Sequence, residues 1–175
     1  MSSFWSNIFR RSEDDSIQTV MESIPLFEGL SSRELDAVVG ILHRREYEVD
    51  EVLFRQGNPG VGMFIIQSGS IDIVYEPTDD TLATLEDGDF FGELALLNET
   101  PRSATAIARQ PSVLFGLFRP DLLGLLERDP ALGVDLLLRM SRVISERLIQ
   151  SNDEVQRLRE QLAAVRTPVE SSSMS

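Results

Sequence analysis

The chain contains neither cysteine nor lysine. Without cysteine it can form no disulfide and no iron–sulfur cluster, and it has no thiolate that could sense redox state. Without lysine it can have no phosphate-loop lysine and no Schiff base. Histidine is scarce too, since His43 is the only one. We therefore expect no metal site of the usual kind and no cofactor.

Long apolar runs are also missing. No stretch approaches the roughly 18 apolar residues that indicate a membrane span. The N-terminus lacks the order of a signal peptide, because Arg10 and Arg11 follow its apolar residues instead of preceding them. We therefore expect a cytoplasmic protein without membrane contact.

Basic residues are few relative to acidic ones. The chain has 16 arginines against 29 acidic residues, which gives a net charge of −13. The negative electrostatic field of such a chain repels nucleic acid, because binding requires basic side chains that neutralise the phosphates. We therefore expect no nucleic-acid partner. An anion site in so acidic a chain must be local, which suits a small ligand held by one arginine. No nucleophile and base stand together in the sequence, so we expect no catalytic residues and no enzyme.

The length of 175 residues fits one domain with extensions. Residues 1–16 combine an aromatic segment with an acidic linker. The aromatic segment is either an amphipathic contact with a membrane or partner or a helix packed on its own domain, and its shortness favours docking onto protein. Beyond it we expect a β-roll with N-terminal helices over 17–130, a long helix over 131–166 and a disordered serine-rich tail over 167–175.

Helical signals precede the expected roll. Ile17–Ile24 is expected to be helical and is followed by Pro25. Ser31 and Glu34 form a capping-box pattern before an apolar stripe that runs to Leu42. His43, near the end of that helix, is interpreted as a surface or cap residue. Short strands with turn residues between them then predict an antiparallel, jelly-roll-like β-roll, hence an α+β fold: Glu46–Val49, Val52–Phe54, Met63–Gln67, Ser70–Tyr75, Leu82–Glu86, Ser103–Ala108 and Val113–Phe118.

Helical periodicity returns near Pro120. Asp121–Arg128 is expected to be a short helix, and a longer helix begins at Asp129–Pro130. The longer helix carries a heptad seam with polar exceptions at two serines, and we predict a homodimer through this coiled coil. The alternative is a single amphipathic helix lying along the roll. The seam consists of Leu137, Ser141, Ile144, Leu148, Ser151, Val155, Leu158, Leu162 and Val165.

The segment Phe91–Ala108 carries the clearest chemistry. Gly92 has no side chain to block close approach of a ligand, and the turn of helix after it offers free N–H groups to an anion. Glu93 can accept a hydrogen bond from a sugar hydroxyl, and Arg102 presents a planar fork that matches two phosphate oxygens. Ser103 adds a hydroxyl beside it. These are the groups needed to hold a cyclic phosphate ester of ribose, although Arg102 paired with an acidic neighbour such as Glu93 is the alternative.

This segment resembles the phosphate-binding cassette of cyclic-nucleotide-binding domains, the family of the catabolite activator proteins and kinase regulatory subunits. The resemblance runs from about Ile24 to Val155 and includes Val52–Gly57, Pro59-Gly60 and Met63–Gly69. It implies a β-roll with a long dimerisation helix. It also implies that a ligand docks on Gly92, Glu93, Leu94 and Ala95, with Arg102 and Ser103 at the phosphate.

The resemblance further implies a set of base-side residues. Ala83 is expected to pack beside the base without a polar contact. Arg147, Ser151 and Asn152 fall where members of the family place ligand-contacting residues on the long helix, and Asn152 departs from the serine of the family pattern. Cyclic AMP is the expected ligand, and cyclic GMP is the alternative.

The expected function is a stand-alone cyclic-nucleotide sensor that signals through its dimer interface and an unknown protein partner. No helix-turn-helix segment follows the long helix, which argues against a transcription factor. The alternative is an interaction module that has kept the roll and the dimer helix but lost its dependence on ligand.

Overall fold

The computed structural model describes residues 19, 21, 22, 24 and 26–166 of the chain, without the side chains of 165 and 166. The predictions for the N-terminal aromatic segment, for the acidic linker and for the serine-rich tail lie outside these residues. The described chain divides into two compact units, and the boundary falls between Asp135 and Leu136. Each unit is described by itself.

Helix α2 (Ser32–Val39) begins with the capping box that the sequence predicts. The Ser31 hydroxyl accepts from the backbone N–H of Glu34 at 3.4 Å, and the Ser31 N–H donates to the Glu34 carboxylate at 2.8 Å. These bonds satisfy two N–H groups that lack partners within the helix. Leu35 and Val38 are buried beneath it.

The predicted extent of this helix was wrong at its C-terminal end. Helix α2 ends at Val39, with Gly40 as its cap, instead of continuing to Leu42. His43 therefore opens strand β1 (His43–Tyr47) and is not at a helix end. It is a surface residue, as predicted, and its Nε2 lies 2.9 Å from Asp121 Oδ2.

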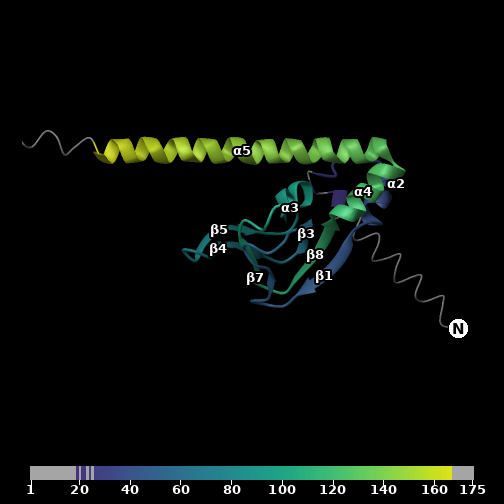
Figure 1. Ribbon diagram of the computed structural model, residues 1–175, viewed down its shortest axis with the longest axis horizontal. Helices are drawn as coiled ribbons and strands as arrows, with labels where there is room; N and C mark the ends of the chain where they lie inside the picture. Colours follow the sequence, from purple (N-terminus) through teal and green to yellow (C-terminus); the bar gives the residue numbers. More distant parts are fainter. Residues whose placement is uncertain (1–18, 20, 23, 25, 167–175) are drawn as a thin grey trace, which may run out of the picture. The chain divides into compact units, whose positions relative to one another are not determined.

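Within the described part of the chain, eight antiparallel strands form two four-stranded sheets, which confirms the predicted antiparallel roll within an α+β fold (Figure 1). Strands distant in sequence pair side by side, as when β8 lies between β1 and β3. The first sheet has the order β1-β8-β3-β6, with β8 (Ser112–Phe118), β3 (Gly62–Ser68) and β6 (Phe90–Phe91). The second has the order β2-β7-β4-β5, with β2 (Val52–Phe54), β7 (Thr105–Ala108), β4 (Ile71–Tyr75) and β5 (Asp80–Leu85).

Several strand limits differ from the predictions because turn geometry, and not residue preference, sets them. The first strand ends at Tyr47 instead of Val49, since Asp50 adopts φ 63° in the turn and its N–H donates to Ala108. Strand β7 begins at Thr105, so Ser103 lies in the bend before it. The two-residue β6 was not predicted.

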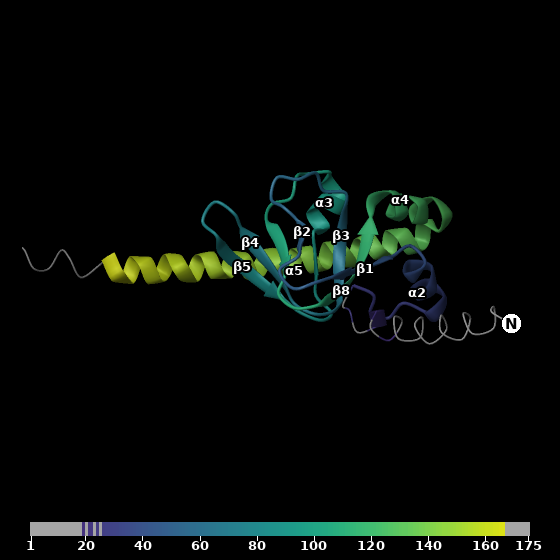
Figure 2. The same ribbon diagram turned by 90° about the horizontal axis from the view of Figure 1, so that it is seen from below.

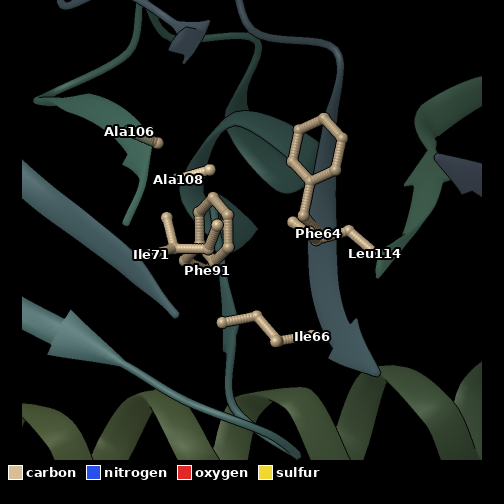
Figure 3. Packing of buried hydrophobic residues seen from close by; sticks show 7 residues of the cluster. All are labelled: Phe64, Ile66, Ile71, Phe91, Ala106, Ala108 and Leu114. Atoms are coloured by element: carbon tan, nitrogen blue, oxygen red, sulfur yellow. The ribbon is translucent and has the colours of Figure 1, made fainter. Parts of the chain in front are cut away.

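The core of the roll is filled by aromatic and branched side chains from both sheets (Figure 3). The rings of Phe64 and Phe91 stack with centroids 5.7 Å apart. Ala106 and Ala108 on β7 are fully buried, and their small side chains leave room for these rings. Close packing of this kind fixes the position of β2, β3 and β6, the strands that lead into the candidate site.

A polar cluster ties β4 to three neighbouring segments. Asp72 Oδ2 accepts from Arg109 Nε at 2.7 Å, and Asp72 Oδ1 accepts from the Thr84 hydroxyl at 2.7 Å. Asp50 lies 3.5 Å from Arg109. Burial opposes ionisation of Asp72, but the two hydrogen bonds and the charge of Arg109 outweigh it and lower the pKa of this carboxyl.

Asp72→Asn is expected to lower the free energy of unfolding at neutral pH by about 1.5–3 kcal/mol, the range for a hydrogen bond to a charged group. Because its pKa is lower in the folded chain, ionised Asp72 stabilises the fold above the ordinary pKa of 3.8. This contribution to stability is lost as the pH falls through the lowered pKa that Asp72 has in the folded chain. Urea unfolding across that range measures it. Asp153→Asn, at an exposed position on α5, is the matched control, and equal losses in both variants would contradict the assignment.

Two helices follow the sheets. Helix α4 (Arg119–Arg128) starts directly after β8, and α5 (Pro130–Arg166) is one continuous helix that contains the whole predicted heptad seam. In the second unit the apolar seam residues Leu148, Val155, Leu158 and Leu162 are exposed. Among the described residues, no helix is long and apolar enough to cross a membrane.

Candidate functional site

The predicted ligand segment forms a strand, a short helix and a loop at one end of the roll. Strand β6 leads into Gly92, which adopts φ 82°, a left-handed conformation that favours glycine. Helix α3 (Glu93–Asn98) follows with no side-chain cap, and in Figure 2 it lies beside β3. The N–H groups of Ala95 and Leu96 donate to the carbonyl of Gly92 at 3.1 and 3.3 Å, which closes the first turn of this helix onto the glycine.

Arg102 is the central side chain of this site. Only 7% of it is exposed, and its Nη1 donates to the carbonyl of Gly62 at 2.7 Å. Its Nε is buried and has no hydrogen-bond partner. Burial alone lowers the pKa of Arg102, and no carboxylate of the described residues forms an ion pair with it. The alternative in which Arg102 pairs with Glu93 is therefore not the arrangement observed.

Aromatic rings and backbone bonds hold Arg102 in place. Its guanidinium carbon lies 4.0 Å from the centroid of the Phe54 ring and 5.8 Å from that of Phe64. Its backbone N–H donates to Asn58 and its carbonyl accepts from Gly57, both at 2.9 Å. These bonds fix the loop between β2 and β3 beside the cassette.

Two glycines allow the backbone to approach the guanidinium closely. A Cβ built on Gly92 would lie 2.5 Å from Arg102 Nη1. A Cβ built on Gly60 would lie 2.3 Å from the Cβ of Ala95 and 3.2 Å from Arg102 Nε. Gly60 and Gly92 thus form a cradle around the buried cation that any larger residue would fill.

The other predicted site residues occupy different surroundings. Glu93 is partly buried, Leu94 is exposed and Ala95 is buried against Gly60. Ser103 and Ala83 are exposed, the former in the bend after Arg102 and the latter on β5. The structure thus brings the helix residues and Arg102 together at the cradle. The remaining three, Arg147, Ser151 and Asn152, lie on α5 in the second unit and stay predictions.

Sequence reasoning missed Phe54 and Gly62 as parts of the site. The strand that ends at Phe54 was predicted, but nothing in its pattern indicates that the ring faces an arginine 48 positions later. Gly62 contributes a carbonyl, a group that every residue carries and that no sequence pattern reveals. The spacing of the glycines from Gly57 to Gly62 was the one available signal of close backbone approach.

The contact between Arg102 and Phe54 is expected to appear as a coupling in stability. In a double-mutant cycle of Phe54→Leu and Arg102→Met, the unfolding free energies should couple by about 1 kcal/mol, the size of a partly buried cation–π contact. Phe118→Leu is the control, because Phe118 packs on Phe64 and not on the guanidinium. Chemical denaturation of the four chains measures the coupling. Equal coupling with Phe118 would show that general packing, and not the ring face, produces the effect.

The described residues offer no metal centre. Within them, no group of three or more His, Cys, Asp or Glu side chains is arranged to hold a metal ion. The chemistry that the arrangement can perform is recognition of an anion. A buried guanidinium, an unpaired Nε and a glycine cradle lie next to the N-terminal end of α3.

Comparison with known proteins places these features in context. Residues 44–129 match the family model of the cyclic nucleotide-binding domain. The Cyclic AMP receptor protein of Thermus thermophilus is 35% identical over 129 residues, which are 72% of this chain and 60% of that protein. The chain spans smaller shares of two longer relatives. It covers 28% of a putative potassium channel protein of Rhodopseudomonas palustris and 24% of a cAMP-dependent protein kinase regulatory subunit of Pyricularia oryzae.

Solved structures show the same likeness. A cyclic nucleotide-binding domain from Methylobacillus flagellatus superimposes with a TM-score of 0.72 at 26% identity, over 82% of each chain. A structure from work on a cyclic-GMP-dependent signalling pathway in bacterial phytopathogenesis shares 35% identity with a TM-score of 0.56. The match covers 66% of this chain and 95% of that one.

Proposed function

The chain belongs to the cyclic nucleotide-binding domain family, and from this premise we propose that it is a cyclic AMP sensor that signals through a dimer interface and a protein partner. The observation that carries the proposal is the state of Arg102. It is a buried cation with an unpaired Nε and no carboxylate partner among the described residues. A buried charge without a counter-ion is costly, and a phosphate would supply the missing charge.

The roles of the residues follow from their chemistry. Arg102 pairs with the cyclic phosphate, while the N–H groups after Gly92 donate to its oxygens. Glu93 accepts a hydrogen bond from the ribose hydroxyl. Leu94 and Ala95 extend the docking surface, and Ser103 adds a donor beside the phosphate. No bond is made or broken, so the chain acts by binding and not by catalysis.

Two observations bear on the choice of base. The relative from Thermus is named for cyclic AMP, whereas the structure from phytopathogenesis work is named for a cyclic GMP pathway. In this chain, Ser151 and Asn152 on α5 would read the amine of adenine, with Arg147 near the ligand and Ala83 beside the base. Cyclic AMP is therefore the proposed ligand, and cyclic GMP is the competitor to test.

The exposed seam of α5 supports dimerisation. Leu148, Val155, Leu158 and Leu162 follow one another at steps of seven, three and four residues on one face of the helix, and each is at least 45% exposed. Burying such a seam against a second copy removes apolar area from water. The polar exception Ser141 donates its hydroxyl to Leu138 within the helix, so it demands no partner across the seam.

One observation favours a second function, a module that does not depend on ligand. The guanidinium of Arg102 donates a hydrogen bond to the Gly62 carbonyl and lies over the Phe54 ring. These two contacts stabilise part of its charge without any anion. In such a module, oligomeric state, partner binding and thermal stability would be the same with and without nucleotide.

Calorimetric titration of the full chain with cyclic AMP and cyclic GMP separates the two functions. We expect binding of cyclic AMP in the micromolar range, weaker binding of cyclic GMP, and none by Arg102→Ala. Sedimentation of the same samples reports the oligomeric state. Absence of heat from the wild type at millimolar nucleotide would rule out the sensor and favour the ligand-independent module.

A further inference from the structure

Helix α3 lacks a cation at its C-terminal end. A helix leaves its last carbonyls unpaired and carries partial negative charge there, which a basic side chain in the last turn commonly offsets. The last turn of α3 has no basic residue, and the next residue, Glu99, adds a negative charge. Glu99 also adopts φ 51°, a left-handed conformation that is unfavourable for a residue with a side chain. This end of the cassette helix therefore needs stabilisation from elsewhere in the chain.

Arg119, the first residue of α4, supplies it. Its Nη1 donates to the carbonyl of Leu97 at 2.7 Å and to that of Leu96 at 3.2 Å, while its Nε lies 3.1 Å from Glu99 Oε1. One guanidinium thus bonds two terminal carbonyls and the carboxylate beyond them. The planar fork of arginine suits three acceptors in a way that a lysine amine does not.

The backbone of Arg119 is fixed as well. Its N–H donates to the carbonyl of Val61 at 2.8 Å, in the segment between Gly60 and Gly62. Arg119 therefore contacts the cassette helix through its side chain and the segment that cradles Arg102 through its main chain. Figures 1 and 2 show α3 and α4 at the same end of the roll.

We infer that Arg119 is a positioning residue that links α4 to the cassette, so that ligand binding at the N-terminal end of α3 is felt at the first turn of α4. Because α3 has only six residues, it moves as one body, and a shift at either end displaces the other. Coupling of this kind is reciprocal, so loss of the link must also weaken the binding of the ligand. The nature of the ligand in this inference rests on the proposed function, but the link itself does not.

The link is tested first in the nucleotide-free chain. Backbone hydrogen exchange of α3 is compared in wild type, Arg119→Met and Arg128→Met. Arg128 is the matched control, since it is an exposed α4 arginine whose Nε donates only within its own helix, to Gly124. We expect exchange in α3 to rise about tenfold in Arg119→Met, as expected for loss of hydrogen bonds to a charged group, and to stay unchanged in the control. Unchanged exchange of α3 in Arg119→Met would overturn the inference.

The second arm adds cyclic AMP. In the wild type we expect nucleotide to slow exchange in both α3 and the first turn of α4. In Arg119→Met we expect affinity to fall about five- to tenfold and the α4 response to disappear while the α3 response remains. A merely structural role would lower stability without separating the two responses. Retention of the α4 response in Arg119→Met would overturn the inference.

The two proposals fail in different ways. A wild type that binds no nucleotide contradicts the sensor function, and the link is then judged by the nucleotide-free arm alone. If Arg119→Met does not fold, Arg119→Lys takes its place, because it keeps the charge and loses the fork. The expected rise in α3 exchange is then about threefold, which lies in the lower part of the range for one ordinary hydrogen bond, and wild-type exchange would overturn the inference.

Discussion

Replacing Arg102 with methionine is expected to weaken cyclic AMP binding about 100-fold or more while changing the unfolding free energy by no more than about 1 kcal/mol. We expect binding to depend on this residue because, of the residues that the structure describes, it is the one cation in the cradle. Stability does not, because the wild-type fold already bears the cost of burying a cation with an unpaired Nε. Methionine removes that cost and fills a similar volume, which offsets the lost contact with Phe54.

Arg102→Lys completes the comparison. Lysine keeps the positive charge but cannot offer two parallel donors, so we expect affinity between those of the wild type and Arg102→Met. Calorimetry gives the affinities and urea unfolding gives the stabilities. Wild-type affinity in Arg102→Met would contradict the assignment of the phosphate to this residue. A loss of stability above about 3 kcal/mol, as for breaking a buried ion pair, would show that Arg102 has a structural partner after all.

Gly92→Ala is expected to reduce cyclic AMP affinity about tenfold or more at a stability cost of about 1–2 kcal/mol. The stability cost arises from φ 82°, which an alanine adopts with strain. The affinity loss has a separate cause. The new Cβ would lie 2.5 Å from Arg102 Nη1, and the far end of a flexible side chain can move away cheaply. The guanidinium then no longer faces the ligand.

Gly88→Ala is the control for backbone strain alone. Gly88 adopts a similar φ of 86°, but a Cβ there meets nothing within 4 Å. We expect a similar loss of stability in thermal or urea unfolding, and unchanged affinity. If both variants lost affinity equally, then the general loosening of the fold, and not displacement of Arg102, would account for the loss.

The fold was predictable from sequence where a local pattern decides it. The capping box at Ser31 and Glu34 and the single long helix after Pro130 were confirmed, because hydrogen-bonding side chains and heptad periodicity act within a few residues. The end of α2 at Val39 and the two-residue β6 were not predictable. Backbone bonds with distant strands set both, and the apolar pattern continued past the true end of the helix.

The candidate site divides in the same way. Gly92 and Arg102 stand out in the sequence because their segment resembles the phosphate-binding cassette, and the structure brings them together. The Phe54 ring, the Gly62 carbonyl and the Arg119 fork were not visible in the sequence. Each acts on a residue far along the chain, so only the folded roll reveals them. The candidate ligand residues were thus visible in the sequence, whereas the residues that hold them in place were not.

The central claim is that the cradle around Arg102 binds the cyclic phosphate of a nucleotide, and calorimetric titration of the full chain with cyclic AMP beside 5′-AMP tests it most directly. We expect one cyclic AMP bound per chain and at least about tenfold weaker binding of 5′-AMP, whose dianionic open phosphate fits the cradle less well. Equal binding of both nucleotides, or no heat with either at millimolar concentration, would contradict it.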